Sequence, residues 1–230
     1  LPIYPRLIIT PDNKVLMSYS KYSANIQDEK IQGNIIMDLD RSTEEIFQAP
    51  AISISPRLLD GRQKNWMPFI HENKLYFIAQ VCPHTIYEVD WKGNLESKLV
   101  HQTNWNSNWF LRESLRGNTN AIKMDDGNYL STFHTVMTKE GCGFYDNGCY
   151  IFEGKPPFKP LYCGSRTYLR AEAAREMHYR KAGSIICNFP VGMVQKNDKL
   201  IISYGDNDSI VKLLITNIDE MKKTMFKVKY

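Results

Sequence analysis

The sequence has little of what a disulfide or zinc framework requires. Its cysteines are odd in number, and no two of them form a C-x-x-C pair. A disulfide scaffold uses an even number of cysteines, and a structural zinc site uses closely spaced pairs of ligands. We therefore expect small apolar side chains at all five cysteine positions, which are Cys82, Cys142, Cys149, Cys163 and Cys187.

Long apolar runs and long basic runs are also missing. No segment approaches the ~18 uninterrupted apolar residues of a membrane-spanning helix, and no secretory signal is visible, which favours the cytoplasm. The net charge is only +4 and no basic run is longer than the pair Lys222–Lys223, so nothing indicates nucleic acid as a partner. The chain opens on Leu1 rather than on methionine, and we allow for residues before it.

Helical pattern is scarce as well. The segment 168–182, "YLRAEAAREMHYRKA", is the one good helical candidate, and a weaker one lies around 218–225. With 230 residues, 43% of them hydrophobic, the chain is long enough for one all-β domain with a full core. We expect a single domain over residues 1–230 with one or two short helices.

Four segments share one pattern, a polar turn followed by an apolar or alternating run that is typical of a strand. Each turn is preceded by another apolar stretch, so each segment predicts a β-hairpin. A third apolar stretch follows each hairpin, at 33–40, 85–90, 148–154 and 210–219. The four segments are "DNKVLMSYS" (12–20), "ENKLYFIAQ" (72–80), "DGNYLSTFH" (126–134) and "NDKLIISYG" (197–205).

The spacing of the four hairpins indicates a repeat. Measured between equivalent turn positions, Lys14, Lys74, Asn128 and Lys199, the intervals are 60, 54 and 71 residues. Intervals of this length suit the four-stranded blades of a β-propeller with long loops. We expect an all-β propeller with four visible repeats; an open sandwich with unrelated hairpins is the alternative.

Polar side chains recur just before the first strand of each repeat. The inner strands of a propeller lie around one axis, so their starts converge on one face of the disc. Three cations there favour an anionic ligand, and the asparagines suit sugar hydroxyls. Each of these side chains, taken alone, is equally suited to satisfying turn carbonyls. The expected binding residues are Arg6, Lys64, Asn65, Arg116, Asn118, Asn120 and Asn188.

These motifs resemble glycoside phosphorylases and hydrolases of family 130. The likeness runs in order through "YPRLIITPDNKVLMSYSKYS", "KNWMPF", "RGNTNAIKMDDGNYLSTFH" and "CNFPVGMV", and ends in the pattern Y-G-x-x-D at 204–208. It implies a five-bladed β-propeller that acts on β-mannosides, with Arg6, Lys64 and His134 at an anion or sugar site and Asp208 on sugar hydroxyls. The sequence also resembles propeller proteins that accompany glycan-building glycosyltransferases.

One position departs from the family pattern. Where the family has E-D-P-R, with the aspartate as general acid, this chain reads Ile3, Tyr4, Pro5, Arg6. Cleaving a bond between sugars requires an acid that protonates the leaving oxygen, and a tyrosine with a pKa near ~10 is a poor one. A nucleotide-sugar donor leaves as a phosphate anion, which requires positive charge instead.

We therefore expect an inverting glycosyltransferase that moves a sugar from a nucleotide sugar or sugar phosphate to an oligosaccharide acceptor. Two alternatives remain. The first is a β-mannoside phosphorylase or hydrolase in which another carboxylate, such as Asp60, replaces the missing acid. The second is a non-catalytic glycan-binding module.

The candidate bases are His134 and Asp208. The ordinary pKa of a histidine suits a base at neutral pH, although a packed structural histidine at position 134 is equally consistent with the sequence. Asp206 and Asp208 form a D-x-D motif, which can hold Mn²⁺ or Mg²⁺. We favour a role of this motif in sugar binding. We therefore expect that the protein requires no cofactor, with a divalent metal as the alternative. Trp105 and Trp109 lie in a polar loop. Two tryptophans in such a loop indicate either a stacking platform for a sugar or a loop that is held in place by buried indoles.

Overall fold

The computed structural model describes most of the chain, namely residues 2–21, 34–38, 52–53, 64–91, 97–107, 109, 115–139, 141–169, 185–207 and 209–230. Within these residues the fold is almost entirely β, with the short helix α2 (Ile218–Lys222) near the C-terminus. This helix confirms the weaker of the two helical predictions; most of the stronger one, 168–182, lies outside the described residues. No helix of the described part is long and apolar enough to cross a membrane.

The first sheet has the strand order β1-β2-β3-β4, and each neighbouring pair is antiparallel. Its strands are β1 (Pro2–Ile9), β2 (Val15–Lys21), β3 (Asn34–Asp38) and β4 (Ile52–Ser53). The register of β1 on β2 shifts between Ile3 and Arg6. Such a bulge bends a strand and re-aims its side chains. The irregularity therefore falls on the positions where the sequence departs from the E-D-P-R pattern.

The second sheet repeats this order with β5-β6-β7-β8. Its strands are β5 (Met67–His71), β6 (Lys74–Gln80), β7 (His84–Val89) and β8 (Ser97–Thr103). Glu72 and Asn73 join β5 to β6 with φ angles of 46° and 62°. Positive φ at both central residues is typical of the tight two-residue turn that matches the twist of a hairpin. The polar turn that the sequence predicted is confirmed.

The third and fourth sheets come from the second half of the chain. The third contains β9 (Arg116–Gly117), β10 (Ile122–Lys123), β11 (Tyr129–Lys139), β12 (Cys142–Phe152), β13 (Pro160–Gly164), β14 (Ile185–Ile186) and β18 (Met225–Lys227). The fourth contains β15 (Asn188–Lys196), β16 (Lys199–Asp206) and β17 (Ile210–Thr216). Because β18 pairs with β13, the end of the chain closes onto the third sheet rather than the fourth.

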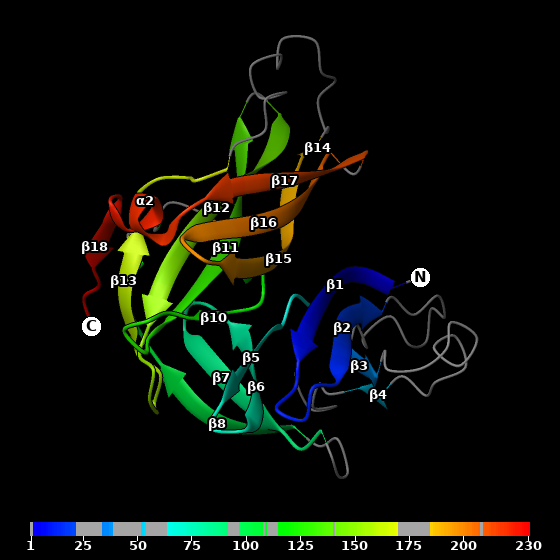
Figure 1. The fold of residues 1–230 in the computed structure, drawn as a ribbon. Helices are drawn as coiled ribbons and strands as arrows, with labels where there is room; N and C mark the ends of the chain where they lie inside the picture. Colours follow the sequence, from blue (N-terminus) through cyan, green and yellow to red (C-terminus); the bar gives the residue numbers. More distant parts are fainter. Residues whose placement is uncertain are drawn as a thin grey trace.

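The first strands of the sheets lie toward one centre, as Figure 1 shows for β1, β5, β10 and β15. Contacts join β1 to both β5 and β15, and they join β10 to β15. Strands that are far apart in sequence therefore lie side by side around one centre, which confirms the propeller-type arrangement.

Aromatic side chains fill the space between the second and third sheets. The ring of Phe69 lies 5.1 Å from Tyr129, 5.5 Å from Phe152 and 5.3 Å from Phe158, measured between ring centroids, with the edge-to-face geometry that aromatic pairs prefer. A separate cluster of Met124, Leu130, Met193, Leu200 and Ile202, among others, joins the third sheet to the fourth. Buried apolar contacts between neighbouring sheets thus hold the blades in place.

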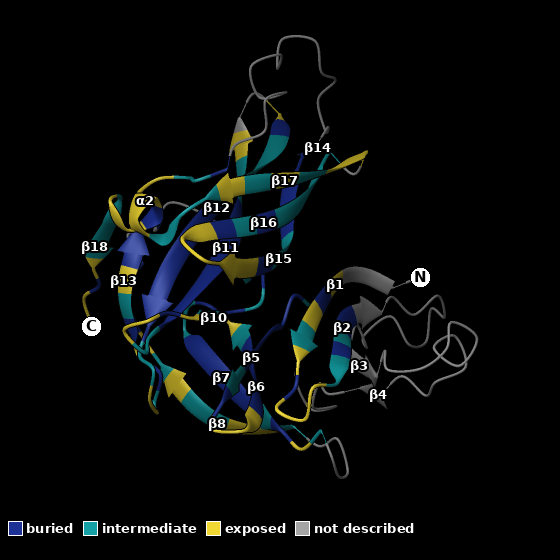
Figure 2. Ribbon diagram, viewed as in Figure 1, coloured by how far each residue is buried: buried dark blue, intermediate teal, exposed yellow. Residues whose placement is uncertain are grey.

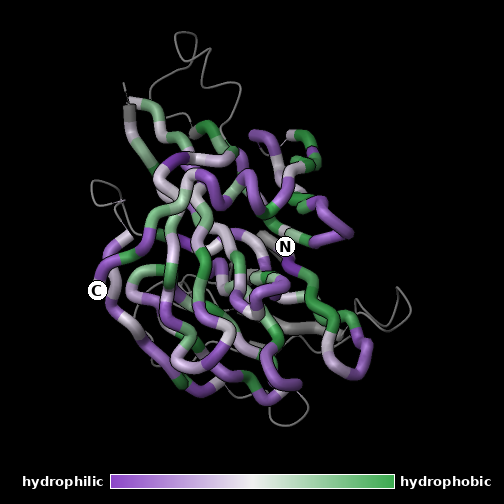
Figure 3. The backbone as a smooth tube through the Cα atoms, turned by 60° about the vertical axis from the view of Figure 1, so that its left-hand side comes forward, coloured by the Kyte–Doolittle hydropathy of each residue, from purple (hydrophilic) through white to green (hydrophobic). Residues whose placement is uncertain are grey.

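One face of the molecule remains apolar and exposed. Val211, Leu213 and Ile215 alternate along β17, and Val211 is 81% exposed; Leu7 and Ile9 are exposed on β1. Figure 2 shows exposed residues in yellow on both β1 and β17, and Figure 3 shows the hydrophobic run of β1 close to the N-terminus. A groove of about 490 Å³, lined by residues of β1, β2 and β15–β17, lies between the two surfaces.

Candidate functional site

Arg6 links the first sheet to the third. Its side chain is 1% exposed, its Nε donates to the carbonyl oxygen of Asn118, and its Nη2 donates to the carbonyl oxygen of Gly117 at 3.3 Å. Burial of a guanidinium is costly unless its N–H groups are paired, and backbone carbonyls pair them without cancelling the charge. A positive charge is therefore held inside the molecule where the inner strands meet.

Gly117 allows this close meeting of strands. A Cβ atom at position 117 would lie 2.4 Å from the carbonyl oxygen of Asn65 and 2.6 Å from the Cγ of Met67. Only a residue without a side chain fits, because heavy atoms cannot approach that closely. The buried Asn65 and the cation Lys64 before it are thus held directly beside β9.

His134 occupies the centre of the site. It lies on β11 opposite Arg116 of β9 and opposite Asn147 of β12. Its ring is stacked on Tyr145 with centroids 4.8 Å apart and planes at 3°, and the edge of Phe189 lies 5.1 Å away. The side chain is 1% exposed. The sequence left open whether His134 is a catalytic base or a packed structural histidine. The structure shows a packed ring that also lies close to the predicted cations.

The charge around His134 comes from three different sheets. Burial has the largest effect on its pKa, followed by the positive charges of Arg116, Arg6 and Lys64, and together they hold the pKa of His134 well below its ordinary value. The carbonyl of Gly117 opposes this with a smaller effect. The imidazole is therefore neutral near pH 7. It lies among three cations, two of which, Lys64 and Arg116, are half-buried.

A chain of buried amides supports the ring. His134 Nδ1 lies 2.6 Å from Asn118 Oδ1, and Asn118 Nδ2 donates to Asn147 Oδ1 at 3.0 Å. Asn147 Nδ2 in turn donates to the carbonyl oxygens of Leu169 at 3.1 Å and Asn188 at 3.0 Å. The predicted residue Asn118 thus contacts His134 directly, and the backbone carbonyl of Asn188 is joined to it through Asn147.

Two other predicted residues form contacts within the protein. The side chain of Asn120 pairs with the backbone of Met193, donating to its oxygen and accepting from its nitrogen, both at 3.0 Å. The carboxylate of Asp206 contacts Lys212 Nζ at 2.5 Å and accepts a hydrogen bond from Asn207. These contacts join the segment between β9 and β10 to β15, and they join β16 to β17. A ligand role for either residue stays a prediction.

Trp105 and Trp109, for which the sequence left two interpretations, are both buried. Both indoles are 7% exposed. Trp105 Nε1 donates to the carbonyl of Val81 at 2.6 Å, and Trp109 Nε1 donates to the carbonyl of Gly164 at 2.8 Å. The ring of Trp105 is stacked on Tyr150, and the ring of Trp109 packs edge-to-face with Phe133. They hold the loop to the blade, which was the alternative interpretation.

Several predicted positions lie outside the described residues. Asp208 is one of them, as is Asp60. The backbone of Tyr4 belongs to β1, while its side chain is outside the description. Their roles as base, metal ligand or replacement acid stay predictions.

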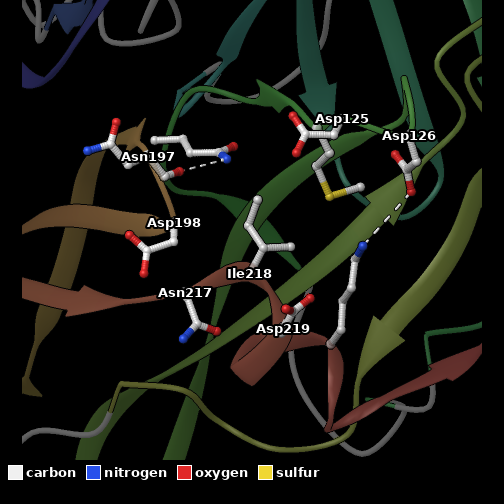
Figure 4. Close-up of a pocket in the computed structure, with 10 residues that line it drawn as sticks. Asp125, Asp126, Asn197, Asp198, Asn217, Ile218 and Asp219 are labelled. Carbon is white, nitrogen blue, oxygen red and sulfur yellow. Dashed lines mark hydrogen bonds and ion pairs between the residues drawn. The ribbon is translucent and has the colours of Figure 1, made fainter.

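A second polar hollow lies at the opposite end of β15 from Asn188. It has a volume of about 610 Å³ and carries four aspartates, Asp125, Asp126, Asp198 and Asp219, all exposed. Figure 4 shows them around Ile218. Lys222 Nζ lies 3.9 Å from Asp126 Oδ2. Among the described residues, no group of three or more histidine, cysteine, aspartate or glutamate side chains is arranged to hold a metal ion. The possible divalent metal therefore stays a prediction.

The sequence analysis missed Asn147 and Asp146, which are both buried. They lie in the middle of β12, a strand that the apolar run predicted to begin only at residue 148. A polar pair directly before "GCYIF" was a usable signal, because a buried strand carries polar side chains only where partners exist.

The fold is of the propeller type, with a buried cationic site where the inner strands meet. A family model described as β-1,4-mannooligosaccharide phosphorylase, glycoside hydrolase family 130, matches residues 14–227. The chain belongs to this family. A search of curated protein sequences finds no match.

Solved structures support the same fold at low sequence identity. The β-1,2-mannobiose phosphorylase from Listeria innocua is 16% identical, with a TM-score of 0.66, and the match covers 96% of this chain and 59% of that one. A family 130 glycoside hydrolase that targets β-1,2-mannosidic linkages in Candida mannan is 14% identical, with a TM-score of 0.66 and coverage of 94% and 65%. An α-L-arabinofuranosidase from Lactobacillus brevis is 13% identical, with a TM-score of 0.58 and coverage of 93% and 71%. The chain thus spans about two thirds or less of the first two proteins.

The family membership corrects the expected activity. The sequence analysis favoured an inverting glycosyltransferase with a nucleotide-sugar donor, and this was wrong, because the matching family contains phosphorylases and hydrolases. The additional resemblance to glycosyltransferase-associated propellers is likewise unsupported. Positive charge at the inner strands was a sound inference, but phosphate as a substrate requires it as much as a nucleotide leaving group does.

Proposed function

We propose that the chain is a β-mannoside phosphorylase or hydrolase whose cationic site binds phosphate, or the anionic part of a sugar phosphate. The observation that carries this proposal is the arrangement of Arg6, Lys64 and Arg116 around a neutral, buried His134. Three cations held in a site of low dielectric constant attract an anion strongly, and guanidinium groups match phosphate oxygens in geometry.

Phosphorolysis explains the use of such a site better than hydrolysis does. In phosphorolysis a phosphate oxygen attacks the anomeric carbon, the glycosidic C–O bond breaks, and the leaving oxygen takes up a proton. The cations would hold the attacking phosphate in position and stabilise its charge. Water as the nucleophile needs no such charge, so three cations favour a phosphorylase over a hydrolase.

A second candidate is a protein that binds glycans or phosphate without catalysis. It is favoured by Tyr4, which stands where the family pattern has its acidic aspartate. The leaving oxygen needs a proton, and general acid catalysis contributes on the order of 10²–10⁴-fold in rate.

Incubation with β-1,4- and β-1,2-mannobiose, with and without inorganic phosphate, separates these functions. A phosphorylase forms mannose 1-phosphate only when phosphate is present, whereas a hydrolase forms mannose in both cases. Calorimetry with phosphate alone tests the site without catalysis. Binding without cleavage of either disaccharide would identify the non-catalytic protein, and absence of phosphate binding would contradict the proposed site.

The variant Tyr4→Asp tests whether the lack of a general acid at position 4 limits the cleavage of mannobiose. If the remaining site is that of a phosphorylase, this substitution raises phosphate-dependent cleavage of mannobiose, because a carboxylic acid is restored next to Arg6. Tyr4→Asn is the matched control, since an amide of similar size cannot donate the proton. An equal rate for the two variants would exclude a catalytic role for an acid at this position.

A further inference from the structure

The chain of amides behind His134 has only one possible direction. It ends at Asn147, whose side-chain amide lies against two backbone carbonyls, those of Leu169 and Asn188. A carbonyl oxygen can accept a hydrogen bond but cannot donate one. The Nδ2 group of Asn147 must therefore face these carbonyls, and its Oδ1 atom must face Asn118.

The orientation of Asn118 follows from that of Asn147. Because Asn147 Oδ1 is an acceptor, the group that lies 3.0 Å from it must be Asn118 Nδ2. Asn118 Oδ1 then faces His134 Nδ1 at 2.6 Å. If the Asn118 amide were reversed, two oxygens would be in contact; if both amides were reversed, an oxygen would face the two carbonyls. All three side chains are 0–1% exposed, so water cannot compensate either arrangement.

We propose that Asn147 is a positioning residue that, through Asn118, fixes His134 as the neutral tautomer with its proton on Nδ1. Nδ1–H donates to Asn118 Oδ1, and Nε2 then carries the lone pair. The ring can accept a hydrogen bond from a hydroxyl group but cannot donate one to a bare oxygen anion. This inference rests on the proposed function for its consequence, although the tautomer itself does not depend on it.

The charged groups around the ring favour the same state. Arg6 of β1, Lys64 before β5 and Arg116 of β9 all oppose a second proton on the imidazole, and the backbone carbonyl of Gly117 acts in the opposite direction with a smaller effect. Tyr145 of β12 covers the face of the ring. A singly protonated phosphate has one P–OH group that can donate to Nε2, whereas sulfate at neutral pH has none. Where Nε2 faces the bound anion, the site is therefore expected to prefer phosphate to sulfate, although the two anions are similar in shape and both are divalent.

Nitrogen NMR of ¹⁵N-histidine-labelled protein without ligand tests the tautomer directly. The expected result is a protonated nitrogen at Nδ1 of His134 and an unprotonated nitrogen at Nε2 near pH 7. His84 is an internal reference, since its Nδ1 lies 3.0 Å from the carbonyl of Phe158 and must be protonated for the same reason. Protonation of His134 at Nε2, alone or together with Nδ1, would overturn the proposal whatever the activity.

The variant Asn147→Ala tests the role of Asn147. We expect the single tautomer of His134 to give way to a mixture while the signals of His84 stay unchanged, which shows that the core remains folded. The ratio of the affinities for phosphate and for sulfate, measured by calorimetry, should fall by about two- to tenfold, which corresponds to the loss of one hydrogen bond. Retention of a pure Nδ1–H tautomer and of the full preference would exclude Asn147 as the positioning residue. If this variant does not fold, the spectrum of the unaltered protein still decides the tautomer.

Discussion

The two ends of β15 carry polar concavities of opposite kinds. At Asn188 the strand adjoins a site with cations from three sheets, in which the polar side chains are buried and hydrogen-bonded to one another. Beyond Lys196, at the other end, lies the hollow of about 610 Å³ with its exposed aspartates. A polar group is held inside a protein only when its partners are in place, whereas an exposed one needs only water. The end with buried, hydrogen-bonded polar side chains, rather than the end with the larger exposed hollow, is therefore the proposed functional end.

Among the substitutions at the two ends, Arg6→Ala is expected to cause the largest loss of stability. Removal of the guanidinium leaves two buried carbonyls, those of Gly117 and Asn118, without this donor. We expect a loss of about 2–5 kcal/mol in the free energy of unfolding, because each unsatisfied buried acceptor costs roughly 1–3 kcal/mol. Urea unfolding measures it. Arg166→Ala, which removes an exposed arginine, is the control and should change stability by less than about 0.5 kcal/mol. Equal stability of the two variants would show that Arg6 is not held as described.

The variants Lys64→Ala and Arg116→Ala should weaken phosphate binding while leaving the stability of the fold almost unchanged. Both side chains are half-buried, so their loss is expected to affect stability little. The affinity for phosphate should fall by about 1.5–3 kcal/mol for each, the usual scale for hydrogen bonds to charged groups. Isothermal titration calorimetry measures the effect, and Lys199→Ala at the opposite end of β15 is the matched control. Unchanged affinity in both variants would remove the anion site.

The dependence of stability on pH should originate partly at His134. Its pKa is lowered on folding, so the unfolded chain binds protons more readily as the pH falls below about 6.5. The free energy of unfolding therefore decreases toward acid, by about 1.4 kcal/mol per pH unit for each such histidine. Burial also lowers the pKa of His84, to about 3, which gives a second contribution. Urea unfolding between pH 7 and 5 should show a shallower slope in His134→Gln, and an unchanged slope would contradict a buried neutral ring.

The smallest effects are expected at the acidic hollow. Asp126 and Asp198 are exposed, and the contact of Asp126 with Lys222 is a 3.9 Å pair between exposed side chains. Asp126→Asn and Asp198→Asn should each change the free energy of unfolding by less than about 0.5 kcal/mol and leave phosphate affinity unaltered. A clear loss of phosphate binding or of mannobiose cleavage in either variant would place function at this end and reverse the comparison.

Much of the architecture follows from local pattern. Short-range alternation and polar turns place the hairpins correctly, because the two residues at a turn and the face of a strand are decided within a few positions along the chain. The edge strand β8 was missed, since its residues 97–103 are largely polar and half-exposed and give no apolar run. The strand β13 was missed as well, and its partner β18 arrives from the far end of the chain.

The sequence alone determined that the strands begin at polar residues and that Arg6, Lys64 and Arg116 belong to one cationic group, because a repeat imposes the same position on each blade. Only the tertiary structure decided what each polar side chain does. It buried Trp105 and Trp109 and engaged Asp206 with Lys212. It also placed Asn147 between Asn118 and two carbonyls from residues 22 and 41 positions away. Hydrogen-bond direction and burial depend on which atoms meet in space, and no short-range pattern carries that information.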